Sequence, residues 1–325
     1  MRVLIAASGG GHTGYAVALA QFLVEFGVEP DFVVPVGDVW SRSKVERYGR
    51  VVAETSKFMG PETPLWKGVL RAPWEFFRVL KRVPGGYDVV VSTGSNHSVL
   101  VALASRFKGA EIINIEASVR FTRPSRAVRV LRRFARLTVL QWSEQKRLVP
   151  EGVVLGPFYE KPEYESYDGG YILVSCGTYG YKQLFDILVK LSSYDNIVLQ
   201  TGRVDPQPYI RARPEWKVFR FDPDLGRWIA GAKLVITHLG KTALDAALTY
   251  RKPLVIVPNP QWTRHGAGLE DARMLARKLN AVLVEPWELS VERLEEAIEE
   301  AMKRKPPIYP NGAKKLAEML VKELL

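Results

Sequence analysis

The chain has 325 residues, of which 47% are hydrophobic and 25% are charged. This length favours two domains of about 150 residues each in a water-soluble protein, and the chain contains no uncharged apolar run of the roughly 18 residues that a membrane span requires. Met1 leads directly into an apolar stretch, so we expect no signal peptide. The single cysteine, Cys176, excludes an internal disulfide framework and suits a reducing compartment.

The formal net charge is +11 at pH 7. Nucleic acid, an anionic membrane surface and polyanionic substrates are the candidate partners of such a basic protein. No RNA-binding signature accompanies the charge, which disfavours nucleic acid.

The first half of the chain alternates apolar strands with amphipathic helices. We expect strands over residues 3–7, 31–36, 88–92, 111–115, 139–142 and 152–157. Helices are expected over residues 13–26 and from the end of the turn at residues 93–97 to residue 107. This alternation is typical of an α/β fold with a parallel sheet.

A polar, turn-rich stretch, residues 160–170, reads as an interdomain linker. The alternation then restarts, with strands predicted over residues 171–175, 196–200, 217–221, 233–236, 254–257 and 282–284, and helices over residues 182–191, 289–303 and 312–325. We therefore expect a first domain over residues 1–160, a linker over residues 161–170 and a second domain over residues 171–325. The C-terminal helix is free to pack back on the first domain.

Glycine-bearing turns follow several predicted strands, after Ala7, Ser92, Ser175, Gln200 and Thr237. Open α/β sheets bind ligands at the carboxyl ends of their strands. The turn after Thr237 opens a helix whose N–H groups could hold a diphosphate, with Asp245 placed one turn further on to accept ribose hydroxyls.

The first of these turns is Ser8-Gly9-Gly10-Gly11-His12-Thr13. A histidine at a helix start behind three glycines is a candidate site residue. The four histidines of the chain lack metal-ligand spacing, so we expect no zinc site. The segment Asp222-Pro223-Asp224 is either an acidic pair for a metal or, as we prefer, a proline turn before a helix.

Residues 62–83 interleave large aromatic residues with cations. This segment either contacts a membrane surface or packs its aromatics into the core. Residues 120–136 are rich in arginine, and the spacing of Arg126, Arg129, Arg133 and Arg136 predicts one cationic helix face. The membrane-contact residues proposed from the two segments are Trp66, Arg71, Trp74, Phe77, Arg78, Arg129 and Arg133.

Residues 1–160 resemble the membrane-associated acceptor subunit of the eukaryotic transferase that adds the second GlcNAc to dolichyl-diphosphate-GlcNAc. The resemblance rests on Ser8-Gly-Gly-Gly-His12-Thr13, Asn114-Ile-Glu116-Ala-Ser118 and Val139-Leu-Gln141-Trp142. Residues 171–325 resemble the catalytic subunit of that enzyme, through Gly177-Thr178, Gln200-Thr-Gly202, Thr237-His-Leu-Gly240 and the stretch from Pro253 to Asn259. The whole chain is thus similar to a fusion of the two subunits, and also to the bacterial GT-B transferase that makes lipid II.

The resemblance implies a GT-B architecture, two Rossmann-like domains facing across a cleft. It implies an inverting, metal-independent transfer of GlcNAc from UDP-GlcNAc to a polyisoprenyl (dolichyl) diphosphate-linked sugar in N-glycan precursor assembly. No cofactor beyond the UDP-sugar is expected, and the enzyme would lie on the cytoplasmic face of the membrane. Its turn at residues 238–245 is one residue shorter than the family pattern, with Asp245 in place of glutamate.

The implied site residues fall into three groups. His12 is the first choice as general base and Glu116 the second. The donor-binding residues would be Gly177, Thr178, Gly202, Phe219, Arg220, Phe221, His238, Gly240, Lys241, Thr242, Asp245 and Asn259. The acceptor diphosphate would be bound by Gly10, Gly11, Thr13, Gly94 and Ser95. Alternatives are a related polysaccharide transferase using another UDP-sugar, or a non-catalytic UDP-sugar-binding protein.

Overall fold

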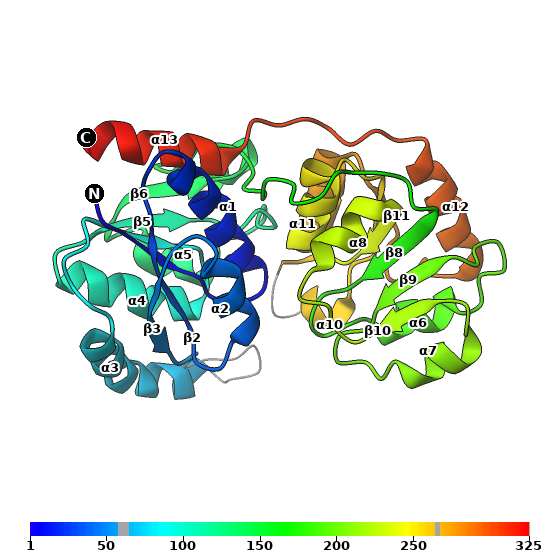
Figure 1. The fold of residues 1–325 in the computed structure, drawn as a ribbon, viewed down its shortest axis with the longest axis horizontal. Coiled ribbons are helices and arrows are strands. Elements are labelled where there is room, and N and C mark those ends of the chain that lie inside the picture. Colours follow the sequence, from blue (N-terminus) through cyan, green and yellow to red (C-terminus); the bar gives the residue numbers. More distant parts are fainter. Residues whose placement is uncertain (58–64, 264–266, 325) are drawn as a thin grey trace. The chain divides into compact units, whose positions relative to one another are not determined.

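The computed structural model describes residues 1–57, 65–263 and 267–324, without the side chains of residues 65–69, 262–263 and 323–324. The chain divides into two compact units (Figure 1). Unit 1 comprises Met1–Glu160 and Pro310–Leu325, and unit 2 comprises Lys161–Tyr309.

Unit 1 is built on a seven-stranded parallel sheet with the strand order β3-β2-β1-β4-β5-β6-β7. The strands are β1 (Val3–Ala6), β2 (Asp31–Pro35), β3 (Val51–Thr55), β4 (Val89–Ser92), β5 (Glu111–Ile115), β6 (Ala135–Leu140) and β7 (Val153–Val154). The central strands are short runs of buried valine, isoleucine and leucine, as expected for a sheet covered on both faces.

Helices cover both faces of this sheet. They are α1 (Gly11–Glu25), α2 (Val39–Val45), α3 (Leu65–Arg82), α4 (Asn96–Phe107), α5 (Arg126–Leu131), the short 3-10 helix η1 (Ser143–Arg147) and α13 (Gly312–Leu324). Alternate residues of each strand face the two layers: Ile5 packs with α1 and α13, whereas Leu4 packs with α3, α4 and α5. The C-terminal helix α13, red in Figure 1, lies beside α1.

Unit 2 repeats the plan with a six-stranded parallel sheet, in the order β10-β9-β8-β11-β12-β13. Its strands are β8 (Tyr171–Ser175), β9 (Ile197–Gln200), β10 (Lys217–Phe219), β11 (Ala232–Thr237), β12 (Leu254–Ile256) and β13 (Val282–Leu283). Its helices are α6 (Lys182–Leu188), α7 (Gln207–Ala212), α8 (Leu225–Gly231), α9 (Lys241–Leu244), the π-helix η2 (Asp245–Thr249), α10 (Pro260–Thr263), α11 (Leu269–Leu279) and α12 (Val291–Met302).

Strand order reverses at the centre of each sheet. In unit 1 the reversal lies between β1 and β4, and in unit 2 between β8 and β11. The two connections leave such neighbouring strands in opposite directions, which opens a crevice at their carboxyl ends. The glycine turns after β1, β4, β8 and β11 therefore lie where each sheet can bind a ligand.

The stretch expected as a linker, residues 161–170, belongs to unit 2. Tyr167 N donates to the carbonyl of Ala230 at 3.0 Å, and Lys252 Nζ donates to Tyr167 O at 2.7 Å. These bonds attach the stretch to unit 2, and the crossing between units falls at residues 160–161 and 309–310 instead.

The predicted cationic helix over residues 126–136 is wrong in its second half. Ser125 caps α5 by accepting from Val128 N, but the helix ends at Leu131 and β6 begins at Ala135. Arg136 therefore lies on a strand and pairs with Glu111 of β5. Strand pairing outweighed the helical spacing of the arginines, because β6 completes a ladder that a longer helix would leave open. Strand β3 and helix α2 were not predicted.

Candidate functional site

The site in unit 1 forms where the turns after β1 and β4 meet. His12 Nδ1 lies 2.7 Å from the carbonyl oxygen of Thr93, and Thr93 Oγ1 donates to Ala6 O at 2.7 Å. A Cβ on Gly94, which has a φ of +82°, would lie 3.5 Å from the His12 ring. The structure thus brings together His12 and Gly94, which are 82 residues apart in sequence, at the switch point of the sheet.

The bond to Thr93 determines the tautomer of His12. A carbonyl oxygen only accepts hydrogen bonds, so Nδ1 carries the proton and Nε2 keeps its lone pair. Burial lowers the pKa of His12 to about 4, partly opposed by the Thr93 bond, while the charges of Lys57 and Arg120 lower the pKa further. The ring is therefore a neutral imidazole at pH 7, with an acceptor nitrogen that no described residue engages.

A chain of hydrogen bonds holds the glycine turn in place. Gly9 N donates to Thr13 Oγ1 at 2.9 Å, Thr13 Oγ1 lies 2.8 Å from Ser41 Oγ, and Ser41 donates to both oxygens of Asp38. Thr13 is fully buried, so its hydroxyl supports the turn from within the fold. Gly10 has a φ of +54°, and a Cβ there would meet nothing within 4 Å, so this part of the turn is open.

His97 is a second, unpredicted anchor of the same turn. Its Nδ1 lies 2.9 Å from Ser8 Oγ and its Nε2 lies 2.8 Å from Thr55 Oγ1, which ties the ends of β1 and β3 to the start of α4. Burial and the charge of Lys57 lower the pKa of His97 to about 3. Next to it, Ser95 has a φ of 151° and a buried Oγ without a partner among the described residues.

Both carboxylate oxygens of Glu116 accept hydrogen bonds from the backbone. Its Oε1 accepts from Ala117 N at 2.7 Å and its Oε2 accepts from Ser125 N at 2.8 Å. Burial raises the pKa of the carboxyl group, and these two amides oppose that rise. The geometry suits a carboxylate that shapes the loop from residue 117 to 125, because a backbone amide holds each of its oxygens.

The site in unit 2 centres on His238, at the end of β11. A Cβ on Gly177 would lie 3.0 Å from His238 Cε1, and one on Gly240 would lie 3.4 Å from the same atom. The imidazole thus lies between two turns. Each turn passes so close to the ring that a residue larger than glycine would crowd it. Burial lowers the pKa of His238 to about 4, and its buried Nδ1 has no partner among the described residues. Thr178, beside Gly177, is exposed.

Lys241 and Asp245 form an ion pair across one turn, where α9 gives way to the π-helix η2. Their side chains are 7% and 18% exposed. π-Helical turns are rare and often occur at functional sites. Lys241 pairs with one carboxylate oxygen of Asp245, so the second oxygen is available to a ligand. Thr242, between them in sequence, is half-buried.

The neighbouring turns of unit 2 also pack closely. Gly202 has a φ of +63°, and a Cβ there would lie 2.5 Å from the Thr178 carbonyl oxygen. Gly202 N donates to Arg220 O at 2.8 Å, and Phe221 is 54% exposed. Phe219, in contrast, packs on the Trp228 ring at 5.6 Å, which turns it toward the core.

Two other polar residues of unit 2 have structural partners. Asn259 is 4% exposed, donates to Gly180 O at 3.2 Å and accepts from Gln261 N at 3.0 Å. Asp222 accepts from Asp224 N at 2.9 Å and from Trp228 Nε1 at 2.8 Å, the geometry of a turn before α8. Among the described residues, no three His, Cys, Asp or Glu side chains are grouped as metal ligands.

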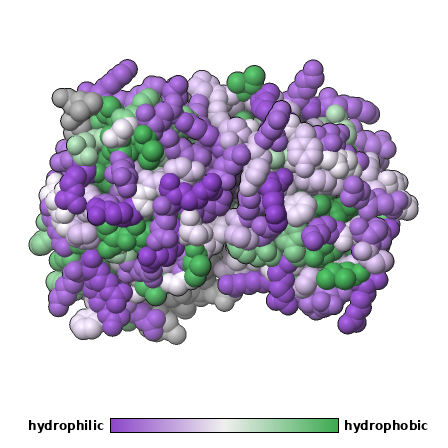
Figure 2. All heavy atoms as spheres, in the orientation of Figure 1, coloured by the Kyte–Doolittle hydropathy of each residue, from purple (hydrophilic) through white to green (hydrophobic). Residues whose placement is uncertain are grey.

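Helix α3 has an exposed apolar stripe. Leu70, Trp74 and Phe77 are 72%, 65% and 59% exposed and recur at helical spacing, whereas Val79 is buried on the opposite face. The exposed Arg78 lies over the Trp74 ring at 5.4 Å. On the face drawn in Figure 2, hydrophilic residues dominate the part of unit 1 where α3 lies.

The remaining membrane-contact residues are distributed unevenly. Arg71 is exposed on α3, Arg129 is exposed on α5, and Arg133 follows the end of α5. The side chain of Trp66 lies outside the described residues. In the part of the chain that the structure describes, no helix is long and apolar enough to cross a membrane.

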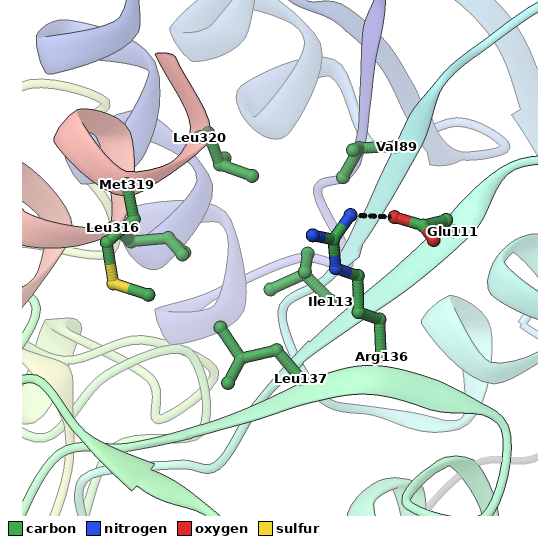
Figure 3. Close-up of a pocket in the computed structure, with 8 residues that line it drawn as sticks. All are labelled: Val89, Glu111, Ile113, Arg136, Leu137, Leu316, Met319 and Leu320. Carbon is green, nitrogen blue, oxygen red and sulfur yellow. Dashed lines mark hydrogen bonds and ion pairs between the residues drawn. The ribbon is translucent and has the colours of Figure 1, made fainter. Parts of the chain in front are cut away.

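A cavity of about 270 Å³ lies at the opposite edge of the unit 1 sheet (Figure 3). Leu316, Met319 and Leu320 of α13 line one side, and the ion pair of Arg136 with Glu111 lies at the other. These strand residues stand at the beginnings of β5 and β6, whereas the predicted site residues follow strand ends. The cavity is therefore separate from the candidate site.

Comparisons with known proteins relate the chain to glycosyltransferases. Residues 171–324 match the Glycosyltransferase family 28 C-terminal domain. The chain is 25% identical over 354 residues to the UDP-N-acetylglucosamine--N-acetylmuramyl-(pentapeptide) pyrophosphoryl-undecaprenol N-acetylglucosamine transferase of Geobacillus kaustophilus, covering 97% of this chain and 94% of that protein. It is 26% identical over 292 residues to the transferase of the same name from a Synechococcus strain, covering 80% of this chain and 75% of the relative.

Among solved structures, MurG of Acinetobacter baumannii superposes with a TM-score of 0.65 at 19% identity, covering 99% of both chains. Two parallel-sheet α/β units of this kind form the GT-B architecture, so the predicted fold class is confirmed.

Proposed function

We propose that this glycosyltransferase, whose residues 171–324 match the family 28 C-terminal domain, transfers GlcNAc from UDP-GlcNAc to a sugar on a polyisoprenyl diphosphate. One observation carries the proposal: the matched domain, residues 171–324, contains the turn in which His238 lies between Gly177 and Gly240. The names of the relatives support UDP-GlcNAc as donor and a diphosphate-linked lipid as acceptor.

In unit 2 the donor would bind over the glycine turns. Backbone N–H groups of Gly177 and Gly240, with Thr178 and Thr242, would hold the UDP diphosphate and stabilise it as the leaving group without a metal ion. Asp245 would accept ribose hydroxyls with the oxygen that its lysine does not occupy. Lys241 would contribute positive charge near the diphosphate.

The loop of Gly202 would flank the uracil base. Its exposed neighbours Arg220 and Phe221 are available to contact the base, whereas Phe219 supports them from the core side. Asn259 would orient the turn at Gly180.

In unit 1, His12 would act as the general base. Its Nε2 lone pair would take the proton of the acceptor hydroxyl as that oxygen attacks the anomeric carbon of GlcNAc and UDP leaves. Gly10 and Gly11 leave room for the acceptor diphosphate beside it, close to Gly94 and Ser95. Glu116 would shape the loop and take no part in proton transfer.

Two acceptor classes fit the proposal. One is dolichyl-diphosphate-GlcNAc, by the resemblance of the motifs, and the other is the undecaprenyl-diphosphate muropeptide in the names of the relatives. The deciding experiment incubates the protein with radiolabelled UDP-GlcNAc, EDTA and each lipid in turn, and measures label in the organic phase. Label on one acceptor identifies the class. Tight UDP-GlcNAc binding without transfer to either would favour a non-catalytic binding protein, and transfer from UDP-glucose or UDP-glucuronate a related polysaccharide transferase.

We also propose that the exposed stripe of α3 holds the enzyme on the inner face of an anionic membrane. Aromatic side chains ringed by arginines are typical of such interfacial helices. Wild-type protein should float with anionic liposomes, and the double variant Trp74→Glu, Phe77→Glu should remain in solution. A wild type that stays wholly in the soluble fraction would contradict the proposal.

A further inference from the structure

Lys57 lies against the glycine turn of unit 1. It follows β3 by two residues, and a Cβ on Gly9 would collide with its ammonium nitrogen. Asp38 Oδ2 would lie 2.8 Å from the same Cβ, but its oxygens already accept from the backbone and hydroxyl of Ser41. Lys57, which follows β3, therefore reaches the turn that follows β1.

The ammonium of Lys57 makes no hydrogen bond or ion pair with any described residue. Its positive charge also lowers the pKa of both His12 and His97. Lys57 is exposed, and its positive charge would interact favourably with an anion bound at the neighbouring turn. The open space at Gly10 is adjacent to it.

We propose that Lys57 binds a phosphate group of the anionic substrate at the glycine turn, beside the His12 imidazole. The turn would supply backbone N–H groups and Lys57 the charge-assisted hydrogen bond. That the anion is the diphosphate of the lipid-linked acceptor rests on the proposed function; that Lys57 binds a diphosphate does not.

The test removes the charge of Lys57 in the full chain. Inorganic pyrophosphate is titrated calorimetrically into protein saturated with UDP, so that the nucleotide turns of unit 2 are occupied. Lys57→Met should weaken pyrophosphate binding by about tenfold, the loss expected for one charge-assisted hydrogen bond. Lys57→Arg should retain most of the affinity. The matched control is Lys314→Met, which removes an exposed charge from α13 of the same unit.

Transfer kinetics provide a second measurement. Lys57→Met should raise the KM for the lipid acceptor by about tenfold and leave the KM for the UDP-sugar unchanged, because the two substrates would bind to different units. A pyrophosphate affinity and acceptor KM equal to those of Lys314→Met would overturn the role of Lys57, even if the wild type is active. If Lys57→Met weakens pyrophosphate binding but the wild-type protein transfers no sugar to either lipid, the role of Lys57 stands. The proposed function is then refuted instead.

Discussion

Replacement of His12 by glutamine tests the mechanism most directly. Glutamine keeps an N–H donor for the carbonyl of Thr93, 2.7 Å from the imidazole, but has no basic nitrogen. Because the pKa of His12 is about 4, neutral imidazole exceeds imidazolium about a thousandfold at pH 7, and the wild-type base is fully available.

Loss of a positioned general base costs about 10²–10⁴-fold in rate, or roughly 3–5.5 kcal/mol of transition-state stabilisation. We therefore expect His12→Gln to lower kcat by that factor, in a radiolabel transfer assay, while the Kd for UDP stays unchanged. An unchanged Tm would show that the fold is intact.

The pH profile adds a second criterion. For free enzyme, kcat/KM should fall tenfold per pH unit below about 4, where His12 becomes protonated. The bound acceptor diphosphate should favour the imidazolium, so the acid limb of kcat should lie at higher pH. Wild-type turnover by His12→Gln, or an acid limb that survives the substitution, would remove His12 from the mechanism.

Three further outcomes follow from the described contacts. Asp245→Ala should weaken UDP binding about tenfold, measured by calorimetry, because the ribose acceptor and the partner of a buried lysine are both lost; an unchanged Kd would reject the ribose role. Gly177→Ala should cost about 1–2 kcal/mol in urea unfolding, from its φ of +67° and a Cβ 3.0 Å from the His238 ring. Gly27→Ala, with a φ of +78° and open space, isolates the φ cost, and equal losses would dismiss the contact. The pKa of His97 is about 3 in the fold and ordinarily 6.5, so between these values the unfolded chain binds a proton that the folded chain does not. The contribution of His97 to stability is therefore complete above pH 6.5 and declines as the pH falls toward 3. Its share at pH 5 is about 2 kcal/mol by the difference in proton binding, and His97→Gln should flatten the decline between pH 7 and pH 5.

The ion pair of Lys241 with Asp245 marks where this chain departs from the pattern that it resembles. The turn is one residue shorter, which places Lys241 in the first turn of the helix. Asp245 stands where the pattern has the longer glutamate. The pair holds the Asp245 carboxylate in one orientation before any ligand arrives, which favours a preorganised ribose contact.

Much of the fold could be predicted from the sequence alone. Runs such as Val89–Ser92 are apolar throughout, and only a strand covered on both faces of a sheet buries every residue of such a run. The alternation of these runs with helices implied two parallel sheets, and the glycines after β1 and β11 indicated ligand turns because their positions follow strand ends.

Local pattern failed where long-range pairing decided the structure. Val51–Thr55 is a half-exposed edge strand that pairs with β2, so its residues show neither a buried run nor a clear helix period. The arginines near residue 136 have helical spacing, but the stretch pairs with β5 and forms strand β6.

The contacts that define the candidate site came only from the tertiary structure. The sequence marked His12 as a site residue, but its tautomer depends on Thr93, 81 residues away. Likewise, Gly177 and Gly240 enclose His238 only because β8 and β11 are neighbours in the sheet. Residue type determined which chemistry was available, since it is a property of each side chain. The strand order determined which side chains meet, since contacts between distant residues depend on packing that no local pattern encodes.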